Sequence, residues 1–235
     1  MPLLLLELSG PLQSWGSGSR FVHRETRMLP TKSGVIGMLA AALGRRRADP
    51  VEDLVSIRFG VRQEQQGALV RDFQTAIDWR TRKSLPLSYR SYVGDAKYLV
   101  ALEAPVPLLE GLAEAIASPA FPLYLGRRAC PPAGRILIGL REQKLEEALA
   151  AEPWRAAEWY RKRQSDQVSL LWSRDARADE QHDETVRDVP RSFDPRHRDY
   201  GLRDVVHGWT RVDNPLGRAS GASSHDAFAL LGGEA

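Results

Sequence analysis

The chain has 235 residues and a formal net charge of +3; 43% of its residues are hydrophobic and 27% are charged. This composition supports a folded core, and no apolar run approaches the roughly 18 residues needed to cross a bilayer. The single cysteine, Cys130, excludes an intramolecular disulfide. The opening MPLLLLELSG lacks the positive segment and the about 7–15 apolar residues of a secretory signal. We expect a cytoplasmic protein without membrane contacts.

The first 140 residues alternate apolar runs typical of strands with two helical patterns. In chain order we expect a strand at 3–8, a Gly- and Ser-rich loop at 13–30, a helix from Thr31 to Gly44, strands at 56–64 and 68–74, a polar insertion at 74–95, a strand at 96–104, a helix at 108–117, and a last strand at 121–125 or 136–140. Without the insertion we interpret this order as the β-α-β-β-α-β pattern with one additional strand. The pattern predicts an α+β, ferredoxin-like domain over residues 1–141 that includes the insertion.

The remaining residues carry a weaker pattern. A short helix is expected at 145–150, a helix or loop at 154–163, and two strands at 167–174 and 198–209. These elements predict a small C-terminal β-containing region over 142–212. The tail 213–235 is rich in Gly, Ser and Ala, and we expect it to be poorly ordered.

Charge is segregated along the chain. Residues 1–47 hold seven basic and two acidic side chains, and residues 71–92 hold five basic and two acidic ones. Residues 174–188 hold three basic and six acidic side chains. Nearly all of the cations are arginine, which suits bidentate phosphate contacts and stacking on bases. A genome rich in Arg codons explains an excess of arginine equally well, but not this segregation.

The segment LPTKSGVIGML at 29–39 begins a helix with two glycines, Gly34 and Gly37. Glycine costs roughly 1 kcal/mol against alanine inside a helix, so both positions need a reason. One interpretation is a phosphate seat formed by the helix N-terminus and Lys32. The other is close packing of the helix on the sheet. The segment is not a Walker A loop, because Thr-Lys-Ser precedes the glycine.

Two further segments are basic. WRTRKSLPLSYRSY at 79–92 alternates cations with aromatic side chains, a mixture that binds single-stranded nucleic acid by phosphate neutralisation and base stacking. The alternative is a solvated loop with its aromatic rings packed inward. LYLGRRACPPAG at 123–134 carries Arg127 and Arg128 after a glycine that can approach a phosphate closely. Its alternative is a turn that ends a strand.

No catalytic, metal or cofactor motif is evident. The five histidines lack metal-ligand spacing, and no GxSxG or GxGxxG sequence occurs. A metal-independent ribonuclease needs only a general base and a cation. His23 and Lys32 are the candidates for that alternative.

Three motifs resemble a known family. SGPLQSWGSGSRF at 9–21, PTKSGVIGMLAAALG at 30–44 and YLGRRACPP at 124–132 occur in the order found in the CasD family of type I-E CRISPR Cascade subunits, the fifth Cas protein family within the RAMP superfamily. VPRSF at 189–193 is a weaker match. The resemblance implies an RRM-related, ferredoxin-like domain with a small C-terminal β region. It also implies a thumb hairpin inserted before the fourth strand, where residues 74–92 lie.

The resemblance further implies a non-catalytic RNA-binding subunit without cofactor or metal. Such a subunit holds the 5′ handle of crRNA at one end of Cascade, contacts the backbone subunits and the large PAM-reading subunit, and meets target DNA only indirectly. The residues expected at the RNA are Gln13, Trp15 and Gly16 in the first loop, Arg27, then Lys32, Ser33, Gly34 and Gly37 at the helix start, Arg80, Arg82, Lys83 and Tyr89 in the thumb, and Arg127 and Arg128.

Overall fold

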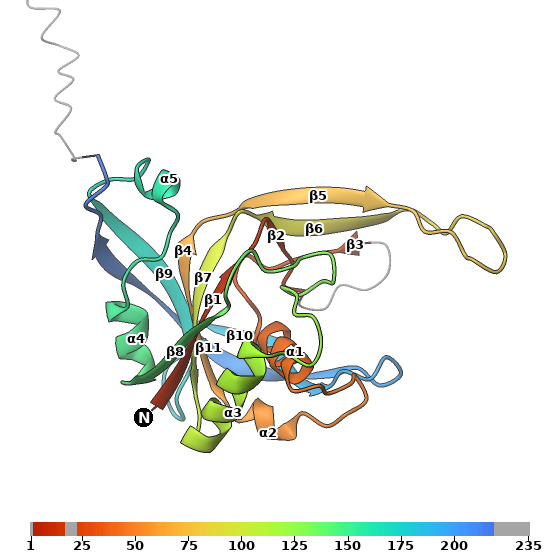
Figure 1. The fold of residues 1–235 in the computed structure, drawn as a ribbon, viewed down its shortest axis with the longest axis horizontal. Helices are drawn as coiled ribbons and strands as arrows, with labels where there is room; N and C mark the ends of the chain where they lie inside the picture. The colour runs from red at the N-terminus through yellow and green to blue at the C-terminus, as the bar shows by residue number, and fades with distance from the viewer. Residues whose placement is uncertain (1, 17–22, 219–235) are drawn as a thin grey trace, which may run out of the picture.

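The computed structural model describes residues 2–16 and 23–218 (Figure 1). Its elements are β1 (Pro2–Ser9), β2 (Leu12–Gln13), β3 (His23–Arg24), α1 (Lys32–Ala42), α2 (Glu52–Val55), β4 (Arg58–Gln65), β5 (Ala68–Gln74), β6 (Ser88–Gly94), β7 (Lys97–Glu103), α3 (Val106–Ala117), β8 (Leu137–Glu142), α4 (Leu145–Ala151), α5 (Glu158–Arg161), β9 (Gln167–Asp175), β10 (Glu184–Ser192) and β11 (Asp199–Asp213). Within these described ranges, each helix is too short or too polar to reach across a bilayer.

A seven-stranded sheet in the order β10-β11-β9-β4-β7-β1-β8 forms the body, and its neighbouring strands are antiparallel. Alternate residues of β1 face opposite sides: Leu4, Leu6 and Leu8 pack with α1 and α3, whereas Leu3 and Leu5 pack with α4. Burial on both faces explains the unbroken leucine run, because a strand covered on both sides needs no polar alternation. Helix α1 comes after β1 in the chain, and α3 comes after β7. Both helices lie on the same face of the sheet, where they pack with Leu4, Leu6 and Leu8 (Figure 1).

Strands β5 and β6 leave the body and form a long projecting hairpin (Figure 1). We call residues 68–94 the arm. Short strand β2 pairs with Val93 and Gly94 of β6 at the base of the arm, and short strand β3 pairs with Tyr89 and Arg90 further out along it (Figure 1). The prediction that residues 68–74 belong to the core sheet is wrong, because they form the first strand of the arm. Their apolar side chains resemble those of a core strand, yet Leu69 and Phe73 are 64% and 67% exposed.

The C-terminal strands continue the main sheet, because β9 pairs with β4 through Gly60–Arg62 and Trp172–Arg174. The division into 1–141 and 142–212 remains a prediction, although one sheet crosses it. Strand β10 is not predicted by the sequence pattern, since acidic residues and Pro190 obscure it. Most of the tail prediction, from residue 219, lies outside the described residues. The first residues of the predicted tail, 213–218, are ordered: buried Asn214 donates hydrogen bonds to the carbonyls of Arg161 and Ser165.

Candidate nucleic-acid interface

The polar groups at the start of α1 have partners within the protein. Thr31 caps the helix by accepting the Gly34 N–H at 3.2 Å. The Lys32 backbone N–H donates to Asp188 at 2.8 Å, and the Lys32 ammonium lies 2.9 Å from Asp175. The whole of Lys32 is only 6% exposed. In this structure, therefore, the two Lys32 groups expected to hold a phosphate have protein partners.

Arg203 completes this buried cluster. Its guanidinium contacts Asp188 at 2.5 Å and Asp175 at 2.7 Å. Two cations and two carboxylates thus balance in charge beneath the first turn of α1. Since buried charges must be paired, the contacts give Lys32 a structural role in joining α1 to the C-terminal strands.

Close packing accounts for Gly34. A Cβ atom at Gly34 would lie 2.8 Å from the ring of Trp15, whereas one at Gly37 would lie 3.4 Å from Phe193, an ordinary contact. Trp15 is 1% exposed, and its indole N–H donates to the side chain of Gln13, which is fully buried. These first-loop residues form part of the core.

Ser33 is likewise 7% exposed. Gly16 is exposed and lies beside the undescribed segment 17–22. Of the predicted first-loop and helix-start residues, Gly16 is the one whose position is open to a ligand.

The loop that carries Gly126, Arg127 and Arg128 lies against the first loop. The Leu125 carbonyl accepts the Ser14 N–H at 3.0 Å. Gly126 has φ +87°, and a Cβ atom there would lie 1.7 Å from the Ser14 carbonyl oxygen, so only glycine fits. Arg127 donates to the carbonyls of Ser91 and Arg24 and thereby joins β3 to β6.

Arg127 also lies over the ring of Tyr92, with its guanidinium carbon 4.8 Å from the ring centroid. Much of its donor capacity is therefore used within the protein. Arg128 is exposed at the same loop. Arg27, by contrast, pairs with Glu184 at 2.5 Å and supports the loop from the side of β10.

Unpaired cations collect on and around the arm. We call the following set the arm cations: Arg24, Arg71, Arg80, Arg82, Lys83, Arg90 and Arg128. Among the described residues, no ion pair involves any of them. At the tip, Arg80 lies over the ring of Trp79, which is 76% exposed. The arm thus presents positive charge and aromatic surface together.

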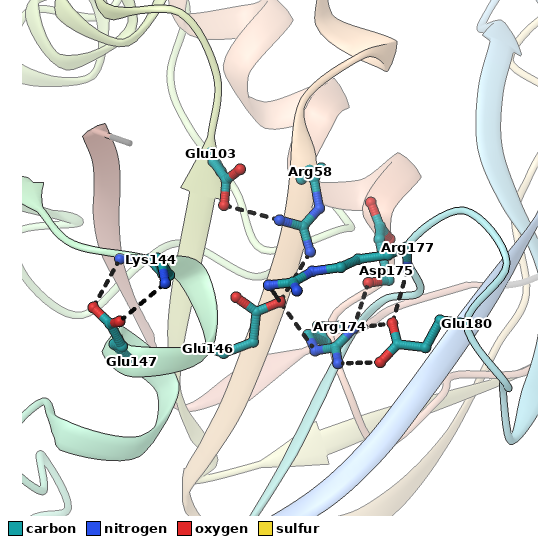
Figure 2. Close-up of polar contacts among 9 residues, drawn as sticks. All are labelled: Arg58, Glu103, Lys144, Glu146, Glu147, Arg174, Asp175, Arg177 and Glu180. Carbon is teal, nitrogen blue, oxygen red and sulfur yellow. Dashed lines mark hydrogen bonds and ion pairs between the residues drawn. The ribbon is translucent and has the colours of Figure 1, made fainter.

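A cluster of arginines in the body, beside α4, is paired with carboxylates (Figure 2). Glu146 contacts Arg58 at 3.1 Å and Arg177 at 2.9 Å. Glu180 contacts Arg174 at 2.6 Å, and this hydrogen bond is the main reason that the pKa of Glu180 falls to about 2. In this cluster each cation is matched by a carboxylate, which leaves little charge for a ligand.

A row of rings and cations crosses the arm. The Arg71 guanidinium carbon lies 4.3 Å from the Tyr89 ring centroid. The His23 ring stacks on Tyr89 at 5.3 Å with an interplanar angle of 9°. Since β5 and β3 lie on opposite edges of β6, Arg71 and His23 approach Tyr89 from opposite sides. His23 and Lys32, the candidates for ribonuclease chemistry, are thus each engaged with other residues.

The sequence interpretation includes Arg90 in the basic and aromatic segment 79–92, but it misses Arg24, Arg71 and Phe73 as members of this surface. The pattern places Arg71 and Phe73 in a core strand, and it places Arg24 in a loop. The available signal is that Arg71 and Asp72 interrupt the apolar run, which is unusual for a central strand.

Residues 3–206 match the family described as CRISPR-associated protein (Cas_Cas5). The CRISPR system Cascade subunit CasD of Escherichia coli (strain K12) is 33% identical over 156 residues, which cover 58% of this chain and 70% of that protein.

Two solved structures are similar over nearly the whole chain. A chain of a CRISPR RNA-guided surveillance complex has a TM-score of 0.75 and 30% identity, covering 97% of this chain and 98% of that one. A second, described as a Cas protein, has a TM-score of 0.67 and 36% identity, covering 92% and 97%. The family match spans most of the chain, and the fold agrees with it. The chain belongs to the Cas5 family of CRISPR-associated proteins.

Proposed function

We propose that this chain is a non-catalytic RNA-binding subunit of a type I-E Cascade complex. It holds the 5′ handle of crRNA, caps one end of the backbone subunits and contacts the large PAM-reading subunit, and it works in the cytoplasm.

We also infer that β1, β4, β7 and β8 with α1 and α3 form a ferredoxin-like unit, in which β7 lies between β1 and β4. The order and the antiparallel pairing support this assignment.

One observation carries the RNA-binding proposal: the seven arm cations, which have no ion-pair partner among the described residues, lie on or beside one projecting hairpin that also exposes the rings of Phe73 and Trp79. Unpaired arginines beside exposed rings suit a single strand, because phosphates bind the cations and bases stack on the rings. The likeness to E. coli CasD and to a chain of an RNA-guided surveillance complex supports the same role.

The test is binding of a labelled RNA that carries a CRISPR repeat handle, measured by fluorescence anisotropy over a series of salt concentrations. Replacing Arg80, Arg82 and Lys83 by alanine is expected to weaken binding. It should also reduce the slope of log affinity against log salt by about 0.7 for each phosphate that the variant no longer neutralises. A matched control replaces Lys144, Lys162 and Arg177, three exposed cations away from the arm, and is expected to keep the wild-type slope.

The same RNA tests for catalysis. Incubation with the purified chain, with and without EDTA, is expected to leave the RNA intact. A cleavage product with a 2′,3′-cyclic phosphate end that His23→Ala abolishes would contradict the proposal and favour a metal-independent endoribonuclease.

A further inference from the structure

The two faces of the arm carry different side chains. Directly opposed residues of paired strands share a face, so the pairs Phe73–Tyr89 and His23–Tyr89 place these three rings on one side of the arm. Arg71 and Leu69 share that side with Phe73, because the three are every second residue of β5 and such residues face the same way. Tyr92 and Arg90 lie on the other side, where Arg127 covers Tyr92. The first face, which we call the ring face, therefore carries an aromatic row that the body does not cover.

Tyr89 is poorly placed to stack on a base. Arg71 lies on one side of its ring and His23 on the other. An incoming base would have to displace one of these neighbours.

Phe73 has the exposed ring that Tyr89 lacks. It lies directly opposite Tyr89 in the strand register, and 67% of its surface is exposed. Among the described residues, Phe73 has no stacked or edge-on aromatic partner. The backbone at this point is held by the ladder to β6 and by Asp72, whose carboxylate accepts the Phe73 N–H at 2.8 Å. The ring is thus presented from a fixed strand position.

We propose that Phe73 stacks on one unpaired nucleobase of a bound single-stranded RNA, and that Arg71 contacts the adjoining phosphate. The Arg71–Tyr89–His23 row acts as a positioning element, because it fixes Arg71 beside Phe73. The proposal rests on the RNA-binding function above and adds the residue that contacts a base. Every base has a π-face, so the position accepts any of the four bases.

The experiment uses the purified chain and handle RNAs that carry the fluorescent base 2-aminopurine at one position at a time. Stacking quenches 2-aminopurine, so wild type is expected to quench one position more strongly than its neighbours. Phe73→Ala is expected to remove that quenching and to weaken binding about 5- to 100-fold, in line with the removal of one base–aromatic stack. Phe73→Trp should restore both signals, because a ring is present again.

Leu69→Ala is the matched control. Leu69 lies on the same strand and the same face and is 64% exposed, but it has no ring. It is expected to keep the quenching and the wild-type affinity. The salt slope should be the same in wild type, Phe73→Ala and Leu69→Ala, since none of these changes removes a cation.

The outcomes separate the two proposals. If wild type binds RNA with the expected salt dependence but Phe73→Ala behaves like Leu69→Ala, the stacking inference is overturned and the RNA-binding function stands. If wild type shows no salt-dependent binding, both fall. If Phe73→Ala and Leu69→Ala both weaken binding, and Phe73→Trp does not restore it, the ring face acts as a general apolar surface and the inference is again overturned.

Discussion

The ammonium of Lys32 lies 2.9 Å from the carboxylate of Asp175, so the first turn of α1 is joined to the end of β9 by a buried ion pair. Asp175 also accepts the Phe59 N–H at 3.0 Å and contacts Arg203. One carboxylate therefore connects α1, β4, β9 and β11. The glycine-rich helix start is held to the C-terminal strands by charge as well as by apolar packing.

Asp175→Asn is expected to lower the free energy of unfolding by about 3–5 kcal/mol, because two buried cations lose their common counter-charge. Urea denaturation measures the change. Lys32→Met should cost less, since Asp175 keeps Arg203. The RNA salt slope of folded Lys32→Met is expected to equal that of wild type; a lower slope would instead support a phosphate contact at Lys32, as the sequence predicts.

Gly34→Ala and Gly111→Ala should have opposite effects although both lie in helices. Gly34→Ala places a methyl group 2.8 Å from the Trp15 ring, and overpacking of this kind costs typically about 1–3 kcal/mol. At Gly111 nothing lies within 4 Å of the added atom, so alanine is expected to add about 0.5–1 kcal/mol of stability. Thermal and urea unfolding of the two variants checks the sign of each change. Equal effects would contradict the packing explanation for Gly34.

At the start of α1, the helix itself can be predicted from the sequence, whereas the partners of its first side chain cannot. The helix at 32–42 follows from its apolar spacing and its Thr31 cap, and both are local signals. The burial and pairing of Lys32 depend on Asp175 and Asp188, which lie 143 and 156 residues further along the chain. No local pattern reveals such partners.

The position of β5 in the arm could not be predicted from the sequence for a related reason. A strand that alternates Leu69, Arg71 and Phe73 with other side chains resembles a half-buried strand in sequence. Only the pairing shows that β5 has left the main sheet. The basic and aromatic character of the arm is predictable from composition, but the exposure of Phe73 and the occupied faces of Tyr89 depend on three-dimensional neighbours.

Arg62→Leu is expected to be strongly destabilising, by about 3–5 kcal/mol. Arg62 and Glu64 are both fully buried at their side chains and lie 2.6 Å apart. Arg62 also donates to the carbonyls of Leu149 and Glu152 at the end of α4. Its removal leaves the Glu64 carboxylate buried without its cation and those carbonyls without their donor.

The double variant Arg62→Leu/Glu64→Leu should recover part of this stability, because no unpaired charge is then buried. Urea denaturation of the two single variants and the double variant gives the coupling between the residues. Additive effects would show that the pair does not interact as the geometry indicates.

Low pH should reduce the stability of the protein by protonating Glu180, which then loses its ion pair with Arg174 in the cluster beside α4. The hydrogen bond from Arg174 holds the pKa of this carboxyl at about 2, against 4.5 without these contacts. Between these values the unfolded chain binds more protons than the folded one, so the stability from Glu180 is present above pH 4.5 and is lost as the pH falls toward 2. The free energy of unfolding of wild type should therefore fall more steeply over this window than that of Glu180→Gln. Glu110→Gln, on the exposed side of α3, is the control and should follow wild type; identical pH profiles for all three proteins would show that Glu180 does not contribute.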